Sequence, residues 1–269
     1  MLKKIKSAFS LWNIVRGADT SSLVRLAALP VSLAVIGEQA SFEQLCSRLG
    51  SAADAVRIHH GQPIEDREGQ IILDAVKLID LSSADFNRAL SAIVIRHAER
   101  RIALAAKFPA FRVPVANMLS HERAVENART AAISALPGVI PLTDWLLPAA
   151  AAGDIYVLTN NQILLLLEVA TCYGRSPDAK ARIKELLPVI GSAFGWRAVA
   201  RELLGVVPGG VGVAVKAVVA YAGTYSIGRA ASYYYSGGTA AVTKEKLLSI
   251  YRAALADGIV RAKEFLARK

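Results

Sequence analysis

The chain has 269 residues, of which 54% are hydrophobic and 20% are charged, and its formal net charge is +10. Soluble globular proteins average about 25% charged residues, so this chain is at once apolar and basic. The hydrophobic content excludes an intrinsically disordered protein. It also argues against an ordinary nucleic-acid-binding protein, whose basic surface usually belongs to a more polar chain.

Residues 1–29 are expected to form a basic amphipathic lead-in region. Apolar side chains recur every three or four residues in its first part, opposite three lysines; they are Leu2, Ile5, Phe9 and Trp12, opposite Lys3, Lys4 and Lys6. Such a helix suits the surface of an anionic membrane, with its lysines at the lipid headgroups. Packing of the same helix on its own domain is an equal alternative.

Residues 30–82 predict a small α/β unit. Val31–Gly37 is a β-branched run that ends at a glycine, and Ser41–Leu49 follows with a helical pattern. Ala55–His60 and Ile71–Asp80 are further expected strands. Phosphate-binding loops have the form GxxxxGK[ST], whereas Phe42, Glu43 and Gln44 stand where that glycine, lysine and hydroxyl would lie. The unit therefore predicts no nucleotide hydrolysis.

From Ser83 to the C-terminus the helical period dominates. Ser83–Lys107, Val113–Leu136 and Thr243–Arg268 are expected helices, the last one amphipathic. Three apolar stretches with one charge each lie between them, namely Thr130–Gly153, Ile155–Gly174 and Leu203–Gly228, and Pro148 and Gly153 are expected to interrupt the first. They fit either a densely packed helical core or membrane-spanning segments, because a run of Leu, Val and Ile can offset one buried charge.

Charge is segregated along this helical region. The part from Thr130 to Gly174 has only acids, Asp144, Asp154 and Glu168, and the part from Leu186 to Gly238 has mainly bases, Arg197, Arg201, Lys216 and Arg229. An unpaired buried ion is strongly unfavourable. We therefore expect Glu168 or Asp154 to pair with Lys216 or Arg197.

Two periodic patterns mark helix contacts. Asp154, Asn161 and Glu168 recur every seven residues on one helix face, which predicts either a polar ion path or interhelical hydrogen bonds that fix the helix register. Small residues recur every four positions at Ala220, Thr224, Gly228 and Ser232. This ridge predicts close helix packing, either inside the domain or between two copies of the chain.

Catalytic and metal-binding motifs are incomplete. His121–Glu122 lacks the second histidine of a zinc helix, because Val125 stands in its place. Cys46 and Cys172 belong to no CxxC or Cys/His cluster. We therefore expect no enzyme activity, no metal and no cofactor.

Residues 137–235 resemble an uncharacterised hydrophobic helical domain at the C-terminus of some bacterial dynamin-like or translation-factor-class GTPases. The matching stretches are ALPGVIPLTD, VLTNNQILLLLEVATCYG, WRAVARELLGVVPGG and VKAVVAYAGTYSIGRAASYYYSGG. LWNIVRGAD and LPVSLAVIGE, upstream, are similar to the start of the GTPase domain in such proteins. Residues recurrent in that family fall on Asp144, Asn161, Gln162, Arg197, Arg201 and Lys216, without a transferable role.

The expected fold is mainly α with a small α/β part: a truncated GTPase-like unit at 30–82, then a hydrophobic multi-helix bundle at 83–269. The resemblance implies a bacterial protein at the cytoplasmic face of the inner membrane, with the cytoplasm as the alternative. The expected function is a non-enzymatic, membrane-associated module that binds a protein partner, such as a GTPase, or itself, and no nucleic acid. A membrane pore that uses the polar stripe and a nucleotide binder without hydrolysis are the alternatives.

Overall fold

The computed structural model describes residues 20–50, 56–59, 70–134, 147–182, 185, 212–237 and 242–267. In these residues the protein is mainly α-helical with a small α/β part, as the sequence predicts. The chain divides into two compact units. One comprises Thr20–Asn117 with Ala170–Pro177, and the other comprises Met118–Val169 and Asp178–Lys269 together with Met1–Asp19. Residues 83–117 thus group with the sheet and not with the helical domain expected for them.

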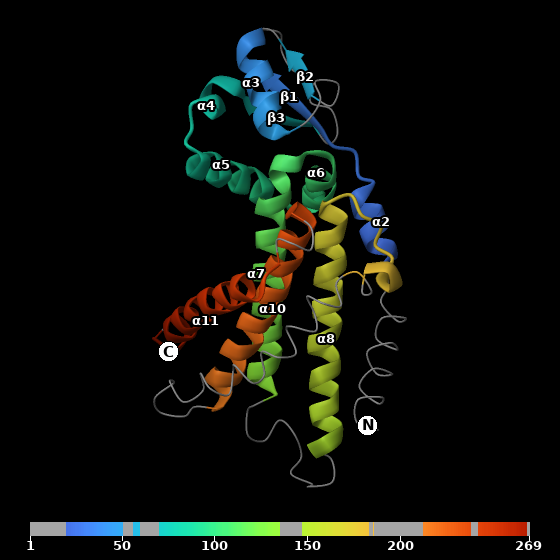
Figure 1. The fold of residues 1–269 in the computed structure, drawn as a ribbon, viewed down its shortest axis with the longest axis vertical. Coiled ribbons are helices and arrows are strands. Elements are labelled where there is room, and N and C mark those ends of the chain that lie inside the picture. The colour runs from blue at the N-terminus through green and yellow to red at the C-terminus, as the bar shows by residue number, and fades with distance from the viewer. Residues whose placement is uncertain are drawn as a thin grey trace. The chain divides into compact units, whose positions relative to one another are not determined.

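The first unit, here called the α/β unit, contains three strands and several short helices (Figure 1). Its elements are α2 (Ser21–Ala27), β1 (Ser32–Ile36), α3 (Gln39–Leu49), β2 (Val56–His59), β3 (Gln70–Asp74), α4 (Ala75–Ile79), α5 (Ser83–Arg96), the 3-10 turn η2 (Ala98–Arg100), α6 (Arg101–Lys107), the 3-10 turn η3 (Pro109–Phe111) and the start of α7 (Arg112–Ile133). The strands form a parallel sheet in the order β2-β1-β3.

Both α3 and α4 cover the same face of this sheet, since they contact each other as well as strands. Leu33 and Val35 of β1 pair in register with Ile71 and Leu73 of β3, and all four are buried. On the opposite face Ile36 and Ile72 are 45% and 52% exposed. That face is therefore exposed at these two positions, although Ala34, which pairs with Ile72 on the same face, is fully buried.

Two element predictions in this unit need correction. The strand expected over Ile71–Asp80 ends at Asp74, because the Asp74 carboxylate accepts a hydrogen bond from the backbone N–H of Lys77 at 3.3 Å and caps α4. The helix expected over Ser83–Lys107 is interrupted at His97, whose φ of −116° and ψ of 45° are not helical.

The second unit, here called the helical unit, contains long helices. They are the remainder of α7, α8 (Leu147–Cys172, of which the last residues count with the α/β unit), α10 (Gly212–Gly237) and α11 (Lys244–Ala267). The expected interruptions at Pro148 and Gly153 are wrong, because α8 passes through both. Proline is tolerated in the first helical turn, where its missing N–H would have no partner, and an interior glycine costs only about 1 kcal/mol.

Candidate functional site

The helical unit has a buried polar cluster at its centre. The Asn127 side chain, fully buried on α7, donates to Thr224 Oγ1 of α10 at 2.8 Å and to the backbone oxygen of Leu158 at 3.2 Å. Its oxygen accepts from Asn161 Nδ2 of α8 at 2.9 Å. Gln162 Nε2 donates to the same Thr224 oxygen at 3.2 Å. One amide thus joins three helices, and its hydrogen-bonding groups are engaged.

An ion pair lies one helical turn from this cluster. Arg123 of α7 donates to both carboxylate oxygens of Glu168 on α8, at 2.6 and 3.2 Å. The Glu168 side chain is only 9% exposed, and Arg123 also reaches Glu126 at 3.2 Å. The hydrogen bond to Glu168 raises the pKa of Arg123 above its usual value. This bidentate geometry is the strong form of a carboxylate–guanidinium contact.

The ion pair corrects one prediction about charge pairing. Lys216 is exposed, so it does not pair inside the unit with Glu168. The partner of Glu168 is Arg123, which comes from the polar face of α7 and not from the basic stretch after Leu186. The reason is geometric. Arg123 and Asn127 lie one turn apart on one face of α7, and Glu168 and Asn161 lie two turns apart on one face of α8. These two faces meet, so Arg123 reaches Glu168 while Asn127 reaches Asn161. Two of the three heptad residues of α8 therefore bond α7.

The small-residue ridge of α10 packs inside the helical unit. Thr224, Gly228 and Ser232 are buried, while Ala220 is half-buried. A Cβ atom on Gly228 would lie 2.1 Å from Ser120 Oγ and 3.0 Å from Leu165 Cδ2. The glycine is therefore required by the close approach of α7 and α8 to this helix.

A second polar cluster joins α7, α10 and α11. The Tyr221 hydroxyl donates to Asp257 Oδ2 at 2.5 Å, and Arg261 Nε donates to the same oxygen at 2.8 Å. His121 Nδ1 lies 3.0 Å from the Tyr221 oxygen. Because the tyrosine proton goes to Asp257, the oxygen accepts from His121, which fixes the proton of the neutral imidazole on Nδ1.

Burial and neighbouring charges set the ionisation of this cluster. Burial and the Asp257 carboxylate raise the pKa of Tyr221, so its proton stays on the hydroxyl. Burial and the nearby Arg261 lower the pKa of His121. Burial alone would raise the pKa of Asp257, but hydrogen bonds from Arg261 and Tyr221 outweigh it and lower that pKa. At neutral pH the cluster therefore combines a neutral histidine with the Asp257–Arg261 ion pair inside α11, and the hydrogen bond from Tyr221 to Asp257 latches α11 onto α10.

The turn after β1 has a packing role. Only Gly37 and Glu38 separate the strand from α3, and Glu38 stands exposed at the helix N-cap. A Cβ atom on Gly37 would lie 2.9 Å from the Cβ of Ala75. The glycine thus lets α4 approach the strand, and the carboxylate occupies the helix end where a phosphate-binding loop offers positive potential.

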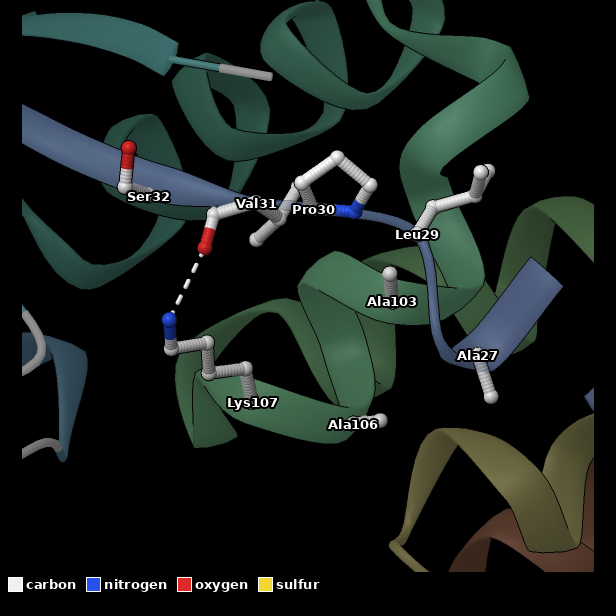
Figure 2. A pocket seen from close by; sticks show the side chains of 8 residues that line it. All are labelled: Ala27, Leu29, Pro30, Val31, Ser32, Ala103, Ala106 and Lys107. Carbon is white, nitrogen blue, oxygen red and sulfur yellow. Dashed lines mark hydrogen bonds between the residues drawn. The ribbon is translucent and has the colours of Figure 1, made fainter. Parts of the chain in front are cut away.

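The α/β unit contains one basic stretch, although its twelve bases and ten acids leave the unit as a whole with little net charge. Residues 86–117 contain six arginines or lysines and one acid, Glu99. Arg88, Arg96 and Lys107 are exposed, and Arg88 is paired with Asp85 at 2.8 Å. A shallow groove of about 530 Å³ lies beside Lys107, between α6 and the chain that links α2 to β1 (Figure 2). The Lys107 ammonium donates to the backbone oxygen of Val31 at 2.9 Å.

Several candidate residues lie outside the described part of the chain. They are Lys3, Lys4, Lys6, Phe9, Trp12, Asp144, Arg197 and Arg201, and the side chain of Asp154 is likewise not described. Sequence reasoning missed Asn127, Asp257 and the basic stretch 86–117. The sequence does contain a signal for Asn127, because it belongs to a stripe of small and polar residues at helical spacing, formed by Ser120, Ala124, Asn127 and Ala131.

No family model, no curated protein and no solved structure matches this chain. Among the described residues, no group of three or more His, Cys, Asp or Glu side chains is placed to hold a metal ion. The helices that the structure describes include none with the length and apolar character needed to cross a bilayer.

Proposed function

We propose that this protein is a non-enzymatic, membrane-associated module that binds a protein partner or a second copy of itself. Its helical unit is the rigid scaffold, and its α/β unit carries the contact surface. A local excess of bases supports the proposal, since residues 83–117 contain six bases and two acids, on helices with exposed aliphatic side chains. An anionic membrane surface attracts such segments by about 1 kcal/mol for each lysine or arginine near it.

Two exposed isoleucines of the sheet support the second part of the proposal. Ile36 and Ile72 lie on the same face, next to the fully buried Ala34, which pairs in register with Ile72. A partner that covered these two isoleucines would remove their apolar surface from water. From the resemblance described above we propose a GTPase as the partner class, at the cytoplasmic face of a bacterial inner membrane.

The geometry favours this proposal over the two alternatives. Asn161 and Glu168 each bond α7, which supports a role in helix register more than an ion path. The two-residue turn after β1 and its exposed Glu38 speak against a nucleotide phosphate at that position.

Vesicle co-sedimentation tests the membrane part of the proposal. The full chain should sediment with vesicles that contain phosphatidylglycerol, remain in solution with pure phosphatidylcholine, and be released by high salt, because salt screens exposed charges. Failure to sediment with anionic vesicles at low salt would contradict the proposal.

A further inference from the structure

Exposed aliphatic side chains of the α/β unit stand next to arginines in the sequence. Val24 is 54% exposed and is followed by the exposed Arg25; Ile95 is 66% exposed and is followed by the exposed Arg96. The two pairs come from neighbouring elements, since α2 contacts both α6 and η2, the turn that directly follows α5. Consecutive side chains of a helix point about 100° apart, so each pair presents an aliphatic and a cationic group on adjoining sides of its helix. The aliphatic group can enter the acyl boundary of a bilayer while the long cationic side chain stays at the phosphates.

The groove beside Lys107 has the same combination of chemistry. Leu29 and Pro30 line one side, Ala103 and Ala106 line the α6 side, and Lys107 is the only charged residue among those that line it (Figure 2). Lysine has three N–H donors, and the contact with the Val31 oxygen uses one of them. The groove therefore offers apolar walls and an exposed ammonium, which matches a lipid with an anionic headgroup.

We infer that Val24, Arg25, Ile95, Arg96 and Lys107, here called the lipid-contact residues, touch the surface of an anionic membrane. The inference rests on the proposed function and identifies the part of the molecule that performs it. Charge complementarity selects the occupant, because residues 83–117 have six bases and only two acids, and both acids are paired, Asp85 with Arg88 at 2.8 Å and Glu99 with Arg100 at 2.7 Å. Phospholipid headgroups supply the negative charge, and the acyl region accepts the two aliphatic side chains.

Matched single substitutions in the α/β unit test the inference. Lys107→Ala is compared with Lys77→Ala, because Lys77 is also exposed but lies on α4. Val24→Asp is compared with Val76→Asp, since Val76 is 58% exposed on the same helix as Lys77. Circular dichroism and thermal unfolding of each variant show that it is folded before it is mixed with vesicles.

The readout is the lipid concentration at which half of the protein sediments with phosphatidylglycerol vesicles. Lys107→Ala should raise it about fivefold, Val24→Asp at least as much, and the two α4 variants should leave it unchanged. Equal binding by all four variants, with the parent chain bound, would overturn this inference and leave the proposed function standing. Absence of binding by the parent chain would overturn both.

Discussion

The two units of the molecule use their polar residues in opposite ways. In the helical unit, Asn127, Glu168 and Thr224 are turned inward and bond neighbouring helices. In the α/β unit, arginines and lysines of α5 and α6 reach the surface, beside exposed aliphatic side chains. The difference separates two roles, since inward polar groups hold helices in register whereas outward charges are available to a partner surface.

The largest effect is expected from the buried ion pair of the helical unit. Arg123→Ala leaves Glu168 buried without its cation and should lower the free energy of unfolding by roughly 3 kcal/mol. Arg88→Ala, in an ion pair whose arginine side chain is 80% exposed, should change it by less than about 1 kcal/mol. Urea denaturation of both variants measures the contrast. If both variants lose the same free energy of unfolding, the buried ion pair stabilises the protein no more than the exposed one does.

Helix packing at the α10 ridge gives the next largest effect. Gly228→Ala introduces a methyl group against Ser120 and Leu165 and should lower the free energy of unfolding by about 2 kcal/mol. Gly223→Ala lies on the same helix with nothing within 4 Å, so it should be neutral or stabilise by up to about 1 kcal/mol, as alanine does in a helix interior. Thermal unfolding followed by circular dichroism compares the two. A tolerated Gly228→Ala would refute the close helix contact.

A smaller and local effect is expected from Arg48 in the α/β unit. Its guanidinium donates to the backbone oxygens of Leu78, Ile79 and Leu81 at 2.6–3.0 Å and lies 4.0 Å over the Phe86 ring. It thereby binds the carbonyls at the end of α4. Arg48→Ala should cost about 1.5 kcal/mol. Hydrogen exchange should accelerate in β1 and β3 while α10 stays protected, and uniform acceleration in both units would contradict a local role for Arg48.

The smallest effect is a pH dependence at the latch of α11. Because burial and Arg261 lower the pKa of His121 below 6.5, the unfolded chain takes up a proton at a higher pH than the folded protein does. Stability is therefore full above pH 6.5 and falls as the pH drops from 6.5 toward the lower folded value. His121→Asn keeps a donor for Tyr221 but cannot titrate, so its urea midpoint should change less over this interval. If the urea midpoint of this variant changes with pH as much as that of the parent chain, His121 is not the cause of the pH dependence.

The sequence predicts the element types well where local patterns are strong. The β-branched run before Gly37, the helix up to Gly50 and the long C-terminal helix lie close to the expected positions. The strand expected up to Asp80 fails because a capping aspartate at position 74 acts locally and overrides the apolar pattern.

The candidate site is harder to predict because it depends on which helices meet. Spacing places Asn161 and Glu168 on one face of α8, but only the structure shows that Asn127 and Arg123 of α7 lie opposite. The Lys216 prediction failed since charge segregation along the chain says nothing about which face of a helix is buried. The basic stretch 86–117 is visible in the sequence as a count of charges, although its exposure is not.

Hydrogen exchange of the full chain with and without phosphatidylglycerol vesicles shows which of the two units meets the membrane. We expect slower exchange at α2, at the end of α5 and at α6 when vesicles are added, with the buried segments of α7, α8 and α10 unchanged. Slower exchange confined to the helical unit, with α2, α5 and α6 unaffected, would contradict this expectation.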